Sequence, residues 1–217
     1  MKKLIIIATL LAGIQFTTTA QTSTADLTPV VAKLDQAKSV DDFKTVANEF
    51  GEIAGSAKAD WLPYYYAAYC NAKIGWLYEK DGDKIEPFAQ LSRQQVKQAL
   101  ALIDTVKQKK ELSELYCVLS MANRAMVFIN PMTYGREYGT KSGNATRLAR
   151  QLNPENPRAL MIEGWEQYET PKMWGGDKVK AKELLTQAKA KFKNDDRSGV
   201  QPHWGEPEAD AILKKLN

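Results

Sequence analysis

Apolar residues recur along this chain at spacings of three and four, which is the period of an amphipathic helix. One clear stripe runs through Val96, Ala99, Ile103 and Val106, and comparable stripes start near residues 30, 43, 61, 111, 145, 157, 181 and 209. No segment shows the convincing period-two alternation that a half-buried strand requires. The pattern therefore predicts an all-α protein with about eight to nine helices.

Local signals predict where several of these helices begin. Pro29 suits a first helical position, because the N–H that proline lacks would have no partner there. Ser39 and Asp42 have the spacing of a capping box. Asn156 followed by Pro157 predicts a cap and a first turn at the start of another helix.

The helices are predicted to form repeated pairs. Long first helices begin near residues 61, 111 and 157, and each is followed by a connection and a second helix. The first helices carry a small residue where a partner could approach closely, namely Ala68, Ser120 and Gly164. The second helices share a rhythm at i, i+4 and i+7, formed by Ala99, Ile103 and Val106, by Ala145, Ala149 and Leu152, and by Ala181, Leu185 and Ala188.

Glycine, proline and aromatic residues gather in the segments between the predicted helices. These segments are KDGDKIEPF (80–88), NPMTYGREYG (130–139), TPKMWGGDK (170–178) and QPHWGEPEA (201–209). In the third, Pro171 is expected to end a helix, Gly175 and Gly176 to form a positive-φ turn, and Asp177 to cap the next helix. Insertions at equivalent places in a helical repeat emerge along one edge, where partners often bind.

The chain resembles a divergent tetratricopeptide-repeat protein and is similar to uncharacterised exported helical-repeat proteins of Gram-negative bacteria. The segments that carry this resemblance are WLPYYYAAYC, NPMTYGREYG, NPRALMIEGWEQYETPKMWGGDKVKA and PHWGEPEA. The resemblance implies a tetratricopeptide-like, right-handed solenoid of helical hairpins, formed by residues 21–217 as a single domain.

The first twenty residues have the features of a cleaved signal peptide. Lys2 and Lys3 precede the apolar run 4–14, and small residues end the segment at Ala20, the expected cleavage position. Without the two lysines the formal net charge falls from +4 to +2, which gives no electrostatic reason to expect nucleic acid as a partner. The mature chain has no apolar run that predicts a transmembrane helix, so a periplasmic or secreted protein is expected.

Cys70 and Cys117 each lie within a helical pattern among apolar neighbours. One interpretation is two buried small side chains. The other is a disulfide between neighbouring helices, which an even cysteine count in an exported chain favours.

Two groups of residues are candidates for binding a partner. Polar or amphipathic residues on the first helices would line a concave groove and bind a partner there. The competing interpretation is that they form a solvated face. These residues are Tyr64, Asn71, Asn123, Arg124, Glu163 and Gln167. Aromatic residues of the connections could form an exposed rim that binds a peptide or a glycan. The competing interpretation is that these rings cover the ends of helix pairs. The residues are Tyr134, Tyr138, Trp174 and Trp204.

The sequence offers little for catalysis or for a cofactor. His203 is the single histidine, and no cysteine or histidine pair supports a metal site. No cofactor is expected, and the segment WGGD lacks the lysine and the preceding strand of a phosphate-binding loop. The preferred hypothesis is a non-enzymatic adaptor or scaffold that binds a protein or peptide in the cell envelope. The alternative is a small-molecule or glycan-binding module built around Trp174, His203 and Trp204.

Overall fold

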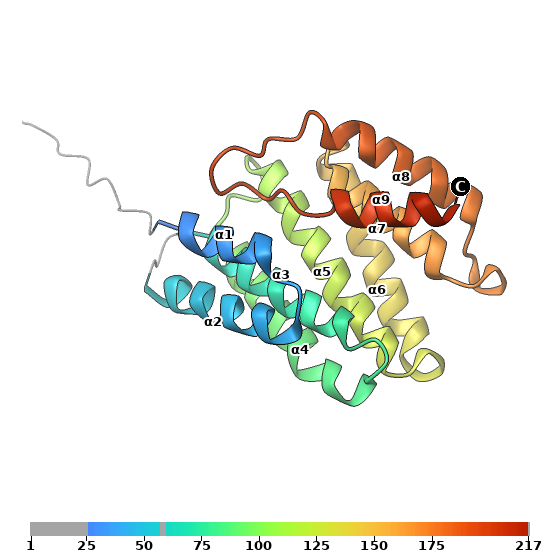
Figure 1. Ribbon diagram of the computed structural model, residues 1–217, viewed down its shortest axis with the longest axis horizontal. Coiled ribbons are helices and arrows are strands. Elements are labelled where there is room, and N and C mark those ends of the chain that lie inside the picture. The colour runs from blue at the N-terminus through green and yellow to red at the C-terminus, as the bar shows by residue number, and fades with distance from the viewer. Residues whose placement is uncertain (1–25, 57–59, 217) are drawn as a thin grey trace, which may run out of the picture.

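The computed structural model describes residues 26–56 and 60–216, and every regular element in these two ranges is helical. This confirms the prediction of an all-α protein (Figure 1). The α-helices of this part of the chain are α1 (Thr28–Gln36), α2 (Val40–Ser56), α3 (Leu62–Leu77), α4 (Ile85–Leu100), α5 (Lys109–Ile129), α6 (Pro131–Leu152), α7 (Pro157–Glu169), α8 (Lys178–Phe192) and α9 (Glu206–Leu216), with short 3₁₀ helices η1 (Gly82–Lys84) and η2 (Lys172–Trp174).

Helices that follow one another in the sequence pack as neighbours. The most extensive contacts join α5 with α6, α3 with α4, α7 with α8, and α2 with α3. The three predicted first helices, α3, α5 and α7, also touch in that order and form the middle of the molecule (Figure 1). Helix α1 packs on α2, and α9 lies against α8 and α7.

Helix α3 is the centre of the largest core cluster. Its sequence is apolar or aromatic on nearly every side, a pattern typical of a helix that is buried all round. Tyr65 and Tyr66 are among the largest fully buried side chains, and the Tyr66 ring stacks on Phe50 of α2 with 4.9 Å between the ring centroids. The aromatic run 61–69 therefore forms core between α2 and the later helices.

Close approach of α7 and α8 depends on a glycine. A Cβ added at Gly164 would lie 2.7 Å from Cγ of Leu185, which is shorter than a carbon–carbon contact allows. The prediction that a small residue stands at this crossing is therefore confirmed.

The turn between α7 and α8 forms largely as predicted. Helix α7 ends before Pro171, Gly175 has a φ of 92°, and the Asp177 carboxylate accepts hydrogen bonds from the backbone N–H groups of Val179 and Lys180. Gly176 does not adopt a positive φ. It is needed for another reason, because a Cβ there would lie 1.7 Å from the carbonyl oxygen of Thr170.

Two predictions about connections are wrong. Residues 131–139 belong to α6, because the Asn130 side chain accepts hydrogen bonds from the N–H groups of Met132 and Thr133, and Pro131 occupies the first turn. Residues 85–88 of the predicted connection 80–88 belong to α4, which begins at Ile85. Helix α4 ends at Leu100, so Val106 of the predicted stripe lies beyond it and is 76% exposed. The supposed loop around Tyr134 is therefore a helix, and the Val106 position does not belong to the core.

Helix α5 has the length and mean hydropathy of a membrane span, but 72% of the relevant window is buried inside the fold. Its apolar composition is therefore explained by its position in the core of the fold. The predicted signal peptide, residues 1–20, lies outside the described residues.

Cys70 and Cys117 are free thiols with no exposed surface. The structure thus agrees with the first of the two interpretations, in which both cysteines are small buried side chains. Burial raises the pKa of both thiols well above the usual cysteine value.

We expect both cysteines to resist alkylation in the native protein. The reagent cannot reach the buried thiols, and their raised pKa suppresses the reactive thiolate form. The rate with iodoacetamide should be at least about tenfold lower than in denaturant, and two adducts should appear by mass spectrometry after unfolding. A mass that shows no adduct in denaturant without reductant would instead reveal a disulfide.

Candidate ligand-binding site

The segment between α8 and α9 connects the C-terminal helices with the N-terminal helices. It leaves α8, extends toward α1 and α3, and returns as α9 (Figure 1). The Tyr66 hydroxyl donates a hydrogen bond of 2.7 Å to the carbonyl oxygen of Val200. The Trp204 indole N–H donates one of 2.7 Å to the Tyr65 hydroxyl. Two buried tyrosines of α3 therefore position this segment.

A cavity of about 550 Å³ lies between this segment, the α1–α2 hairpin and α3. We call it the Trp204 cavity. It has the size of a small-molecule site and is lined mainly by apolar and aromatic side chains with a few charged groups. The lining residues are Leu34, Asp35, Ala37, Lys38, Phe43, Tyr66, Tyr69, Lys73, Leu77, His203, Trp204, Gly205, Pro207, Glu208 and Ala211.

The Trp204 ring is held in a fixed orientation. It stacks on Tyr69 with 4.7 Å between the centroids and an interplanar angle of 23°. Gly205, which follows it, has a φ of 105° and passes close to the side chains of Phe192 and Met161. Burial raises the pKa of the Tyr69 phenol well above its usual value, so this part of the wall is uncharged.

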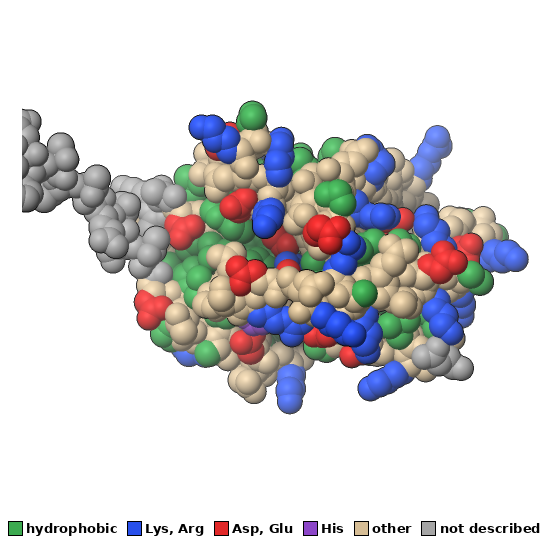
Figure 2. Space-filling model, turned by 90° about the horizontal axis from the view of Figure 1, so that it is seen from above, with side chains coloured by type: hydrophobic (Ala, Val, Ile, Leu, Met, Phe, Trp, Pro, Cys, Tyr) green, Lys and Arg blue, Asp and Glu red, His purple; other side chains and the backbone are tan. Residues whose placement is uncertain are grey.

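His203 connects the C-terminal segment to α1. Its Nε2 lies 2.8 Å from a carboxylate oxygen of Asp35, and its Nδ1 lies 2.8 Å from the carbonyl oxygen of Gln201. Both ring nitrogens thus lie within hydrogen-bond distance of an oxygen atom, and the imidazole links Gln201 with Asp35. The purple patch in the space-filling view is this histidine, at the surface beside charged side chains (Figure 2).

The other charged groups at the cavity differ in their pairing. Lys73 contacts Glu208 across 2.9 Å, and Asp35 contacts His203. Lys38 is exposed and forms no ion pair with any residue in the described ranges. The Lys38 ammonium group at the rim is therefore available to pair with a ligand carboxylate.

A buried charge network lies behind the Trp204 cavity. Tyr65, which accepts the Trp204 N–H, donates to Glu114 at 2.9 Å. Both oxygens of Glu114 accept from Arg158 Nε, and the rest of the guanidinium contacts Asp195. The network lines a polar cavity of about 370 Å³, and it ties α5, α7 and the C-terminal segment together.

The structure separates the three residues of the predicted aromatic pocket. His203 and Trp204 line the Trp204 cavity, whereas Trp174 lies in η2 and is 57% exposed. Tyr134 lies in α6 beside Tyr138, with 5.8 Å between the ring centroids. The four aromatic residues of the supposed rim are thus divided among separate places.

The polar residues predicted for a concave groove are largely used within the fold. Asn71 is buried and donates to the Ala67 carbonyl and to Gln95. Arg124 contacts Glu166 at 2.9 Å.

The remaining groove candidates lie apart from one another. Glu163 contacts Arg150 and Lys180, and together with Gln167 it lines a cavity between α6 and α7. Tyr64 packs at the edge of the core. Asn123 faces a different cavity, between α4, α5 and α6.

Several residues of the Trp204 cavity were not among the predicted site residues, notably Leu34, Phe43, Tyr69 and Lys73. Leu34, Phe43 and Tyr69 belong to apolar stripes, so the sequence marks them as core. Each is indeed buried, and each also forms part of the cavity wall.

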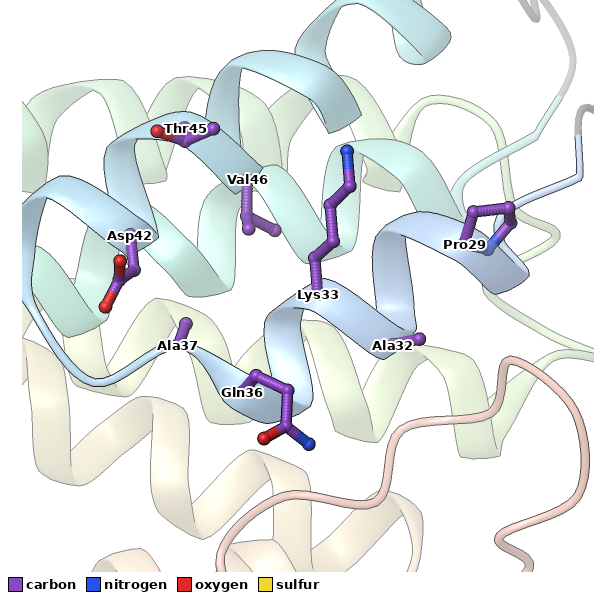
Figure 3. A pocket seen from close by; sticks show the side chains of 8 residues that line it. All are labelled: Pro29, Ala32, Lys33, Gln36, Ala37, Asp42, Thr45 and Val46. Atoms are coloured by element: carbon purple, nitrogen blue, oxygen red, sulfur yellow. The ribbon is translucent and has the colours of Figure 1, made fainter.

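A shallow groove of about 440 Å³ between α1 and α2 offers less for a ligand (Figure 3). Its Lys33 is paired with Glu49 at 2.8 Å. Its Asp42 accepts a hydrogen bond from the Ser39 N–H, which confirms the predicted capping box. In the part of the chain that the structure describes, no group of three or more histidine, cysteine or acidic side chains is arranged to hold a metal ion.

Among solved structures, this chain is similar to the HusA haemophore from Porphyromonas gingivalis. The two match with a TM-score of 0.76 and 28% sequence identity, over 88% of this chain and 90% of the haemophore. No family model matches the sequence, and no curated protein matches it. The resemblance to tetratricopeptide repeats therefore gains no support from these comparisons.

Proposed function

We propose that this protein is an exported, non-enzymatic carrier of a flat, carboxylate-bearing small molecule of the haem or porphyrin class, bound in the Trp204 cavity. The observation that carries this proposal is the fixed aromatic wall of Trp204 and Tyr69 at the edge of a 550 Å³ cavity. The similarity to a haemophore over nearly the whole chain supports it.

The lining of the cavity suits a flat molecule with an apolar body and acidic groups. Aromatic rings favour offset stacking on other π-systems, and Phe43 and Leu34 add apolar surface to the lining. Lys38, which is exposed and forms no ion pair among the described residues, can attract a carboxylate at the rim. The ligand would thus be bound by stacking and burial in the cavity and by charge at its edge.

Coordination of iron is not required for this binding. The Nε2 atom of His203 already contacts Asp35, so His203 would have to release that carboxylate before it could bind a metal. We therefore expect haem and iron-free protoporphyrin to bind with similar affinity.

The Trp204→Leu variant should bind both ligands about tenfold more weakly than the wild-type protein, since it removes the stacking surface. The measurement is a titration followed by ligand absorbance and tryptophan fluorescence, with circular dichroism to verify that each variant is folded. Trp174→Leu is the matched control, because Trp174 is exposed in η2 and does not line the cavity. Equal weakening in both variants, or no binding by the wild-type protein, would overturn the proposal.

The adaptor hypothesis has less support than the small-molecule alternative. Asn71, Arg124 and Glu163, which would have held an extended peptide, are engaged with other side chains of the same chain. A peptide would have to displace these internal contacts before it could bind.

A further inference from the structure

A second cavity, of about 520 Å³, lies between α4, α5 and α6, away from the α1–α2 hairpin and α9. We call it the Asn123 cavity. None of its lining residues is shared with the Trp204 cavity.

Asn123 is the unusual residue of this cavity. It is only 5% exposed, yet its side-chain amide forms no hydrogen bond with any residue within 26–56 or 60–216. The other buried asparagines are satisfied, since Asn71 donates to Ala67 and Gln95, and Asn156 donates to Glu114. The amide atoms of Asn123 are not fully buried, because within 26–56 and 60–216 the one fully buried side-chain polar atom without a hydrogen bond is Nε of Arg124. The Asn123 amide therefore reaches the solvent of the cavity and can bind a ligand there.

The charges at the Asn123 cavity are all positive. Arg93 lies 5.2 Å from the Tyr138 ring centroid and Lys141 lies 4.7 Å from it, so the ring stands near two cations. Arg93 forms no ion pair among the described residues, whereas Lys141 contacts Glu137 on its own helix. No aspartate or glutamate lines the cavity. Its charge therefore favours an anion, and it differs in this from the Trp204 cavity, where Asp35 and Glu208 are present.

The rest of the lining is apolar. Leu119 and Tyr116 come from α5, and Ala145 and Leu148 come from α6. These side chains are partly or fully buried and offer a surface for an aliphatic chain. A short, fully polar anion would leave this surface unused.

We propose that the Asn123 cavity binds an aliphatic carboxylic acid, such as a free fatty acid, at a site separate from the porphyrin site. A guanidinium binds a carboxylate in a planar, two-point geometry, so Arg93 would hold the acid group. The Asn123 amide, which faces the cavity, would donate to the same oxygen atoms. The hydrocarbon chain would lie on Leu119 and Leu148.

The experiment is a calorimetric titration of the full-length protein with dodecanoate, together with two comparison ligands. Dodecanol keeps the chain and lacks the acid, and acetate keeps the acid and lacks the chain. Dodecanoate is expected to bind at least about tenfold more tightly than either. Equal binding of dodecanoate and dodecanol would overturn the role of Arg93 and Asn123, and absence of dodecanoate binding would overturn the site.

Variants locate the binding. Arg93→Gln and Asn123→Ala should each weaken dodecanoate binding about tenfold, and the Asn123 side-chain amide signal should shift in ¹⁵N NMR spectra when dodecanoate is added to the wild-type protein. Arg136→Gln is the matched control for Arg93, because Arg136 is an exposed residue of α6 outside the cavity lining. If Arg93→Gln binds dodecanoate as the wild-type protein does, the assignment is wrong.

The Trp204→Leu variant separates this site from the porphyrin site. It should bind dodecanoate normally, whatever its affinity for haem, because Trp204 does not line the Asn123 cavity. A loss of dodecanoate binding in Trp204→Leu alone would place the acid in the Trp204 cavity and overturn the second site.

Discussion

The Arg158→Met variant is expected to lose about 3–5 kcal/mol of unfolding free energy, measured by urea denaturation. The Arg158 side chain is 5% exposed, and its partners Glu114 and Asp195 are almost as buried. Methionine fills a similar volume but leaves Glu114 without its cation. The cost of a buried, uncompensated carboxylate then dominates the result.

The effect of Arg158→Met should extend to the ligand site. Glu114 also accepts hydrogen bonds from Tyr65 and Asn156, and Tyr65 in turn accepts the Trp204 N–H. When Glu114 moves, Tyr65 moves with it and the Trp204 indole N–H loses its acceptor. We therefore expect the variant to show a changed tryptophan emission in the native state as well as a lower stability.

Arg147→Met is the control for Arg158→Met. Arg147 is exposed on α6 and its guanidinium donates one hydrogen bond, to Gln151. Replacement should change the unfolding free energy by less than about 0.5 kcal/mol. A loss of similar size in both variants would show that the buried network does not contribute as described.

The Gly164→Val variant is expected to lose about 3 kcal/mol, at the upper end for an overpacked site. Its Cβ would meet Leu185 Cγ at 2.7 Å, and the Leu185 backbone N at 3.3 Å limits how far the side chain can retreat. Helices α7 and α8 would have to separate, and the contacts of their whole interface would weaken. Thermal denaturation followed by circular dichroism measures the loss.

Gly51→Val in α2 is the matched control, because an added Cβ there meets no atom within 4 Å. The intrinsic helix propensities of glycine and valine differ by a few tenths of a kcal/mol, so its stability should change by less than about 0.5 kcal/mol. Equal stability of the two variants would mean that α7 and α8 do not approach each other as closely as the structure shows.

The sequence predicts the fold class and many helix ends because both depend on local interactions. Pro29, Ser39 with Asp42, and Asp177 act within one turn of their own helix, and each is found as expected. The same asparagine–proline pair that starts α7 at residue 156 also starts α6 at residue 130. The prediction of a loop at residues 130–139 fails because glycines and tyrosines are also typical of connections, and here they follow a capped helix start.

The proposed ligand site is harder to predict because it depends on contacts between distant segments. Tyr66 and Val200 are joined by a hydrogen bond, yet nothing local in either segment indicates the other. The sequence pattern predicts Tyr69 to be a core residue, and Tyr69 is buried. It also forms part of the cavity wall, a second role that the sequence pattern does not indicate. His203 and Trp204 could be proposed only because an aromatic pair beside glycine and proline is uncommon in a plain turn.

The Trp204 cavity is made from residues 34–43, 66–77 and 203–211, which are among the first and the last parts of the described chain. Helices α1 to α8 can therefore pack while the cavity still lacks one wall. The proposed ligand could be bound only after residues 203–211 have docked. A carrier built in this way would leave the ribosome empty and acquire its cargo as a finished molecule, downstream of translation.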